Sequence, residues 1–77
     1  MLEKIKQVIS EKLNVSEDEI TEDTVFTDDL GADSIDIMEM IMDVETEYDI
    51  ELPTEKLENI STVRDLIDLL KEMGVEE

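Results

Sequence analysis

The apolar residues of the first fourteen positions are spaced three or four apart, as on one face of a helix. They are Leu2, Ile5, Val8, Ile9 and Leu13. This spacing predicts an amphipathic helix over residues 2–14, and Asn14 is its expected stop. A last helix is predicted from a similar face formed by Val63, Leu66, Ile67, Leu70 and Met73. We expect Thr62 and Asp65 to open that helix as a capping box and Gly74 to end it.

The first helix is followed by weaker signals. Ser16 and Glu19 match the capping-box pattern, which predicts a short turn that leads into a loop over residues 21–32. Three apolar residues are expected to anchor this loop to the core: Val25, Phe26 and Leu30.

A second main helix is expected to begin at Asp33 or Ser34 and to run to Tyr48 or Asp49. Pro53 blocks its continuation, and Thr54 is expected to cap a short helical turn. No segment alternates with period two over a useful length. The sequence therefore predicts a single all-α domain over residues 1–77, a small bundle of three main helices plus one short helix. A long loop is expected between the first and second main helices.

The second main helix carries more apolar residues than one core-facing stripe needs. One face holds Ile37, Met40, Ile41, Val44 and Tyr48. A second apolar stripe lies well over 90° away around the helix and holds Ile35, Met38 and Met42. Between the two faces lies an acidic stripe of Asp36, Glu39, Asp43 and Glu47. Either the bundle wraps this helix and covers both apolar faces, or one face is a docking strip for partners with apolar and basic surfaces.

The distribution of charge helps to choose between these two interpretations of the second apolar stripe. The chain has 24 acids, six bases and a formal net charge of -18, and no Lys or Arg lies between Lys12 and Lys56. Such a surface repels nucleic acid and anionic lipid and attracts basic protein surfaces. This regional acidity favours a dedicated binding face. No apolar run reaches membrane-spanning length and no signal peptide is recognised, so we expect a cytosolic protein or a mature chain whose targeting segment has been removed. We also expect a monomer.

The composition also limits the chemistry. The chain has neither Cys nor His, so it lacks thiolate metal ligands, a cysteine nucleophile and the commonest general base. Ser34 has no nearby base and is therefore interpreted as a serine that another enzyme modifies, with no catalytic residue and no metal ligand assigned. The start of a helix favours a bound phosphate, and Gly31 and Ala32 are expected to leave the approach to Ser34 open.

The sequence around Ser34 reads D-D-L-G-A-D-S-I-D over residues 28–36. It resembles the phosphopantetheine attachment motif of acyl carrier proteins, D-L-G-A-D-S-L-D. The order and spacing of the other elements resemble the same family along essentially the whole chain. Ile35 departs from the usual leucine, and Ile37 stands where a small or polar residue is common. The G-A-D-S form looks more like fatty-acid carriers than peptidyl carriers.

The resemblance implies that the protein is a carrier and not an enzyme. Ser34 would carry 4′-phosphopantetheine, added from coenzyme A by a carrier-protein synthase, and the arm's thiol would hold acyl thioesters for fatty-acid biosynthesis enzymes. The second main helix would recognise these partners, and a loaded acyl tail would tuck between the helices. The expected partner-binding residues are Ile35, Asp36, Met38, Glu39, Met42, Asp43 and Glu47.

Several alternatives stay open at this point. Within the family, the chain could serve polyketide synthesis or D-alanyl transfer. An acidic divalent-cation-binding protein is a different class, but an EF-hand fits poorly. Aligning Gly31 with the loop glycine puts Phe26 at the first ligand position and Ile37 at that of the bidentate glutamate. A disordered acidic segment is opposed by the regular helical periodicity and the paired caps.

Overall fold

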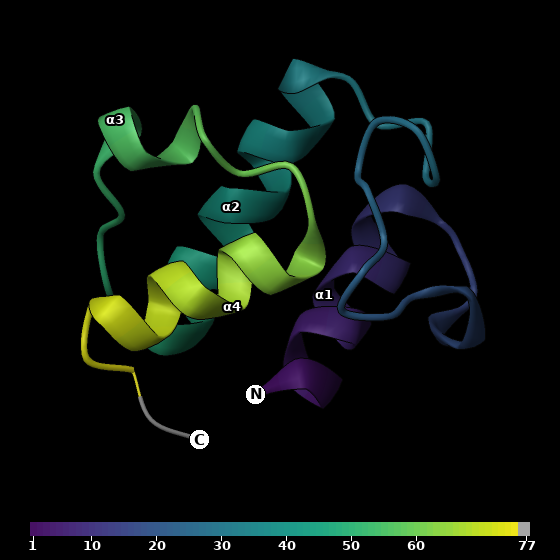
Figure 1. The fold of residues 1–77 in the computed structure, drawn as a ribbon. Helices are drawn as coiled ribbons and strands as arrows, with labels where there is room; N and C mark the ends of the chain where they lie inside the picture. The colour runs from purple at the N-terminus through teal and green to yellow at the C-terminus, as the bar shows by residue number, and fades with distance from the viewer. Residues whose placement is uncertain (76–77) are drawn as a thin grey trace.

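The computed structural model describes residues 1–75, and their helices pack as a small bundle (Figure 1). The elements in chain order are α1 (Leu2–Leu13), the 3₁₀ turn η1 (Glu17–Glu19), α2 (Ser34–Tyr48), α3 (Thr54–Leu57) and α4 (Val63–Glu72). The predicted all-α architecture is confirmed, with three main helices, one short helix and a long loop before α2. Among the described residues, strand-like pairing is limited to one antiparallel bridge, between Val25 and Thr62.

The ends of the main helices follow the local chemistry of the sequence. Asn14 and Asp49 end α1 and α2 in the left-handed conformation, with φ of 57° and 54°. Thr62 and Asp65 form the predicted capping box of α4, since each side chain accepts a hydrogen bond from the other residue's backbone N–H. These caps stop α1 and α2 and start α4 close to where the sequence predicts.

The predicted cap at Thr54 is wrong, and the one at Ser16 is right only in part, because Ser16 caps η1 but Glu19 does not complete a capping box. Ser16 accepts a hydrogen bond from the backbone N–H of Asp18, and Glu19 returns none, because η1 is a three-residue 3₁₀ turn without the geometry of an α-helical start. Thr54 is the first residue of α3 itself. The residue before it, Pro53, is the N-cap and has no side-chain hydrogen bond to offer.

One hydrophobic core joins the three main helices. The inner face of α2 contributes Met40, Ile41 and Val44, each at most 1% exposed, as predicted. Met73, assigned to the inner face of the last helix, is 38% exposed. It lies just beyond Glu72, where α4 ends, so the helical periodicity no longer determines which way it faces. The core also contains five residues that neither the helical faces nor the expected loop anchors singled out: Met1, Ile20, Ala32, Leu52 and Leu69.

The long loop before α2 is fixed to the start of α4. The Phe26 N–H donates to the Ser61 carbonyl at 3.0 Å, and the Val63 N–H donates to the Thr24 carbonyl at 3.0 Å. The Arg64 guanidinium lies 3.2 Å from an Asp23 carboxylate oxygen. Phe26 is fully buried, and its carbonyl accepts from the Ala32 N–H at 3.0 Å. These contacts position the segment that leads into α2.

Within residues 1–75 no helix is both long and apolar enough to cross a membrane.

Candidate functional site

Ser34 is the first residue of α2, and its side chain is exposed. Asp33 caps the helix by accepting from the Asp36 N–H at 2.9 Å, and Asp36 accepts from the Asp33 N–H at 3.3 Å. The capping box therefore directs one oxygen of each carboxylate toward the backbone. The N–H groups of Ser34 and Ile35 donate no hydrogen bond within residues 1–75. Two free donors at the positive end of a helix suit a phosphate on Ser34.

Gly31 and Ala32 lead into the N-cap of α2 and so border the approach to Ser34. Gly31 has φ of +68°, a conformation that favours glycine, and a Cβ built on it would meet nothing within 4 Å. Ala32 is only 5% exposed and belongs to the core. Its methyl group is packed in the core and does not cover the exposed Ser34, which is compatible with the expectation that Ala32 leaves the approach open. Ala32 also ties the loop to the core, because its N–H donates to the carbonyl of the buried Phe26.

A largely apolar cavity of about 330 Å³ begins beside Ser34. It lies between the first turns of α2 and the segment containing α3. Its lining residues are Ser34, Ile37, Met38, Thr54, Leu57, Glu58 and Ile60. Ser34 supplies a hydroxyl at the cavity, and most of the other lining side chains are apolar. A hydroxyl at the mouth of a mostly apolar cavity fits an arm that is attached through a phosphate and carries an apolar chain at its far end.

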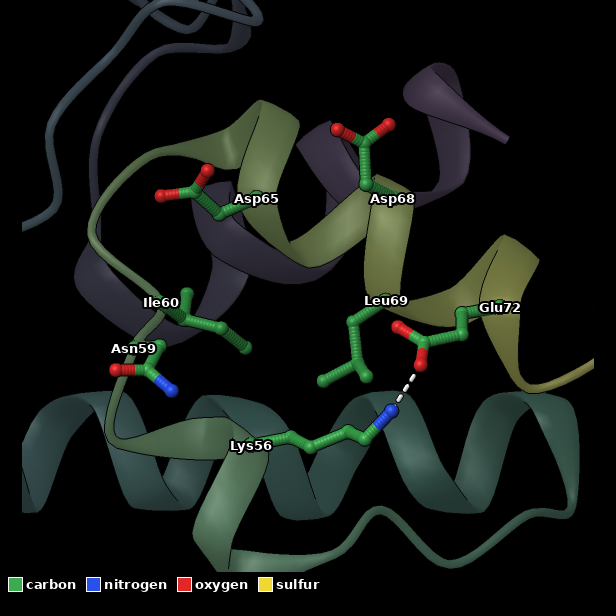
Figure 2. A pocket seen from close by; sticks show the side chains of 7 residues that line it. All are labelled: Lys56, Asn59, Ile60, Asp65, Asp68, Leu69 and Glu72. Carbon is green, nitrogen blue, oxygen red and sulfur yellow. Dashed lines mark hydrogen bonds and ion pairs between the residues drawn. The ribbon is translucent and has the colours of Figure 1, made fainter.

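A second cavity of about 350 Å³ lies on the other side of Ile60, between the α3 segment and α4 (Figure 2). Its lining residues are Lys56, Asn59, Ile60, Asp65, Asp68, Leu69 and Glu72. Figure 2 shows the Lys56 ammonium directed at the Glu72 carboxylate, with which it forms an ion pair. Ser34 does not line this cavity, and three carboxylates do. Burying an apolar chain there would be unfavourable, so we assign the site to the first cavity.

Asp65, which lines the second cavity, has a structural role at the start of α4. The N–H groups of Ser61 and Thr62 donate to its Oδ2 at 3.0 and 3.1 Å. These hydrogen bonds stabilise the carboxylate and hold the pKa of Asp65 below its ordinary value. Within the described part of the chain, carboxylates do not gather in a group of three or more that could hold a metal ion.

The second apolar stripe of α2 faces solvent. Ile35 is 68% exposed, Met38 45% and Met42 60%. On the opposite face Met40 is fully buried. The alternative in which the bundle covers both faces is therefore wrong. We call Ile35, Met38 and Met42 the apolar strip; it begins directly beside Ser34.

The acids beside the apolar strip are not equivalent. Glu39, Asp43 and Glu47 are exposed, whereas Asp36 is half-buried and belongs to the capping box. Lys12 Nζ lies 3.2 Å from Asp43 Oδ2, and Lys4 Nζ lies 2.6 Å from Glu47 Oε1. A hydrogen bond from Lys4 to the Glu47 carboxylate, together with its negative charge, raises the pKa of Lys4. These α1 lysines are functional candidates that the sequence pattern did not reveal.

Known proteins resemble the chain along nearly its whole length. The profile of the family described as the phosphopantetheine attachment site matches residues 3–70. An acyl carrier protein from Clostridium perfringens is 49% identical over 72 residues, which cover 94% of this chain and 95% of the relative. Another from Sulfurovum sp. is 45% identical over 71 residues, covering 92% of this chain and 95% of the relative.

Comparison of the fold with solved structures indicates the same family. A solved structure from Mycobacterium tuberculosis, assigned as an acyl carrier protein, matches with a TM-score of 0.86 at 32% identity, covering 94% of this chain and 96% of that one. The matched domain is the attachment site of phosphopantetheine, and proteins of this family are carriers, not enzymes. With its helical bundle, its G-A-D-S helix start and relatives sharing almost half of its residues, this chain belongs to the acyl carrier proteins.

Proposed function

We propose that Ser34 is the attachment residue for 4′-phosphopantetheine and that the protein shuttles acyl thioesters between fatty-acid biosynthesis enzymes. The observation that carries this proposal is the environment of Ser34. Its hydroxyl is exposed at the start of α2, beside two backbone N–H groups that have no acceptor within residues 1–75 and at an apolar cavity of about 330 Å³. No other serine of the chain stands in a G-A-D-S sequence.

The attachment step requires the Ser34 hydroxyl to act as nucleophile inside another enzyme. Its Oγ forms a bond to the phosphorus next to the pantetheine unit of coenzyme A. The pyrophosphate bond of coenzyme A breaks, and adenosine 3′,5′-bisphosphate leaves. The chain has no histidine, and the carboxylates next to Ser34, those of Asp33 and Asp36, accept backbone hydrogen bonds in the capping box. The base that accepts the serine proton would therefore come from the carrier-protein synthase.

Once attached, the arm supplies a thiol that holds the acyl group as a thioester. The residues of this chain would bind and orient it. The free N–H groups of Ser34 and Ile35 would face the phosphate, and Leu57 and Ile60 would contact the apolar part of the cargo. Covering the cargo would shield it from water between enzymes.

The exposed side of α2 is the proposed docking surface. The apolar strip would contact an apolar patch of the carrier-protein synthase or of a fatty-acid enzyme. The acids beside it would face the Lys and Arg residues around that patch. The two methionines of the strip suit a surface that must fit several partners. A monomer in the cytoplasm stays our prediction, as does fatty-acid cargo in preference to polyketide or D-alanyl groups.

Mass spectrometry tests the attachment residue. The unmodified chain is incubated with coenzyme A and a carrier-protein synthase, and we expect a mass gain of one phosphopantetheine, located on Ser34 by peptide analysis. Ser34→Ala should gain nothing. Ser16→Ala is the matched control, because Ser16 is also an exposed residue at the start of a helical turn, and this variant should be modified normally. Modification of Ser34→Ala would refute the assignment.

A further inference from the structure

The acidic stripe of α2 is divided by its contacts with α1. Near the Ser34 end, Glu39 is exposed and its side chain has no ion pair or hydrogen bond within residues 1–75. Farther along, Asp43 pairs with Lys12 and Glu47 pairs with Lys4. The two lysines come from the same helix, α1, which contacts α2 along the bundle. Within residues 1–75, the half of the stripe near Ser34 therefore has no lysine partner, with Glu39 free and Asp36 held in the capping box, whereas the two acids of the far half are paired.

The spacing of the acids along α2 and the screening of charge by salt determine whether a basic partner distinguishes the two halves of the stripe. Glu39 and Glu47 are eight residues apart, or about 12 Å along a helix that rises 1.5 Å per residue. The Debye length at physiological salt is about 8 Å, so a cation at Glu39 is largely screened from Glu47. Asp43 is four residues from Glu39, about 6 Å along the helix, and its pairing with Lys12 limits how strongly it attracts the same cation. The half that carries uncompensated charge is the half next to Ser34 and to the exposed Ile35 and Met38.

We propose that Lys4 and Lys12 determine which part of α2 a basic partner engages. By pairing with Glu47 and Asp43, they direct the Lys and Arg residues of a carrier-protein synthase to Glu39 and the Ser34 end of the helix. A partner engages the far half only by replacing the two lysines. This inference rests on the proposed function, because it takes the exposed face of α2 as the docking surface.

The two ion pairs are exposed enough for the cations of a partner to replace the lysines. The side chains of Lys12 and Asp43 are 31% and 49% exposed, and those of Lys4 and Glu47 are 45% and 41% exposed. Ion pairs at such exposed positions are weak, so they bias docking without preventing it. Removing one lysine should then change binding by a factor of up to about five, the upper end of the range measured for exposed pairs.

The experiment measures the association rate of the unmodified chain with a carrier-protein synthase at low and at physiological ionic strength. Lys12→Gln should raise the rate about two- to fivefold at low salt, because it frees Asp43 for the partner. Lys71→Gln is the matched control. It removes the same charge from α4, where the Lys71 side chain has no ion pair or hydrogen bond within residues 1–75. The control should change the rate by less than about 1.5-fold, as expected for general charge alone.

A double variant identifies the route of the effect. In the Asp43→Asn background, Lys12→Gln should raise the rate no more than Lys71→Gln does. Equal rates for Lys12→Gln and Lys71→Gln would overturn the inference, and so would a Lys12→Gln gain that persists without the Asp43 charge. Lys4→Gln with Glu47→Gln repeats the cycle at the second pair, in case a Lys12 variant folds poorly.

The two proposals fail in different ways. Absence of phosphopantetheine transfer to the unaltered chain would overturn the proposed function and this inference with it. Normal transfer to Ser34, with association rates that do not distinguish Lys12→Gln from Lys71→Gln, would overturn only the role of the lysines.

Discussion

Three methionines on one helix test whether α2 has separate core and docking faces. Met40 is fully buried, whereas Met38 and Met42 are 45% and 60% exposed. Each is replaced by alanine, which forms helix at least as well as methionine, so the change in burial dominates the result. Truncating a buried methionine costs about 2–5 kcal/mol, because apolar contact is lost and a cavity is left behind. An exposed substitution usually changes stability by no more than about 0.5 kcal/mol.

These values are large compared with the stability of so small a protein. At 0.05–0.15 kcal/mol per residue, a chain of this size unfolds with a free energy of about 4–12 kcal/mol. One kcal/mol shifts the melting temperature of such a domain by about 4–8 °C. We therefore expect Met40→Ala to lower it by at least about 8 °C and Met42→Ala by at most about 4 °C. Met38 also lines the cavity beside Ser34, so its variant should fall between the two.

The assay is thermal unfolding of the three variants and the unaltered chain in the same buffer, followed by circular dichroism. Urea titration of the same samples gives the free energy of unfolding and shows through the m-value whether unfolding remains two-state. A loss of about 2 kcal/mol or more in Met42→Ala would place that residue in the core. The reasoning that separates the two faces of α2 would then be wrong.

Three further predictions concern the net charge, the Asp65 carboxylate and the docking surface. Added salt or millimolar magnesium or calcium should raise the melting temperature, because ions screen the repulsion within a chain of net charge -18; a melting temperature indifferent to both would contradict this. Because its pKa is lowered by the N–H groups of Ser61 and Thr62, the Asp65 carboxylate should stabilise the fold above its ordinary pKa of 3.8 and lose this effect as the pH falls through its lower folded value. The stability difference between the unaltered chain and Asp65→Asn should therefore be largest near neutral pH and shrink in acid; a difference constant with pH would refute it. Glu39→Lys should slow association with a carrier-protein synthase and weaken its salt dependence, whereas Met42→Ala should speed dissociation; an unchanged association rate would remove Glu39 from the docking surface.

Much of the fold follows from local sequence because the helices are amphipathic and their ends are chemically marked. The exposed face of α2 was predictable for the same reason: Ile35, Met38 and Met42 cannot share a side of the helix with Met40. Ser16 caps its turn as predicted, but the capping box with Glu19 is incomplete because the three residues wind into a 3₁₀ turn, a distinction that residue types alone do not determine. The prediction that Met73 lies on the inner face of the last helix was wrong because the helix ends one residue before it.

The remaining features depend on contacts between distant segments. Leu52 is buried after α2 has ended, and its N–H donates to Glu45 Oε2 at 2.7 Å, a bond that no helical period predicts. The pairing of Lys12 with Asp43 requires the two helices to be placed side by side first. The positions of lysines in α1 and of acids in α2 indicate that such pairs are possible. Only packing decides which of them form.

The central claim is that Ser34 carries the phosphopantetheine arm, and intact-mass measurement after incubation with coenzyme A and a carrier-protein synthase tests it most directly. The account predicts a gain of one phosphopantetheine in the unaltered chain, with peptide analysis locating it on Ser34 and no gain in Ser34→Ala. An arm found on another serine, or a Ser34→Ala variant that still gains the mass, would contradict it.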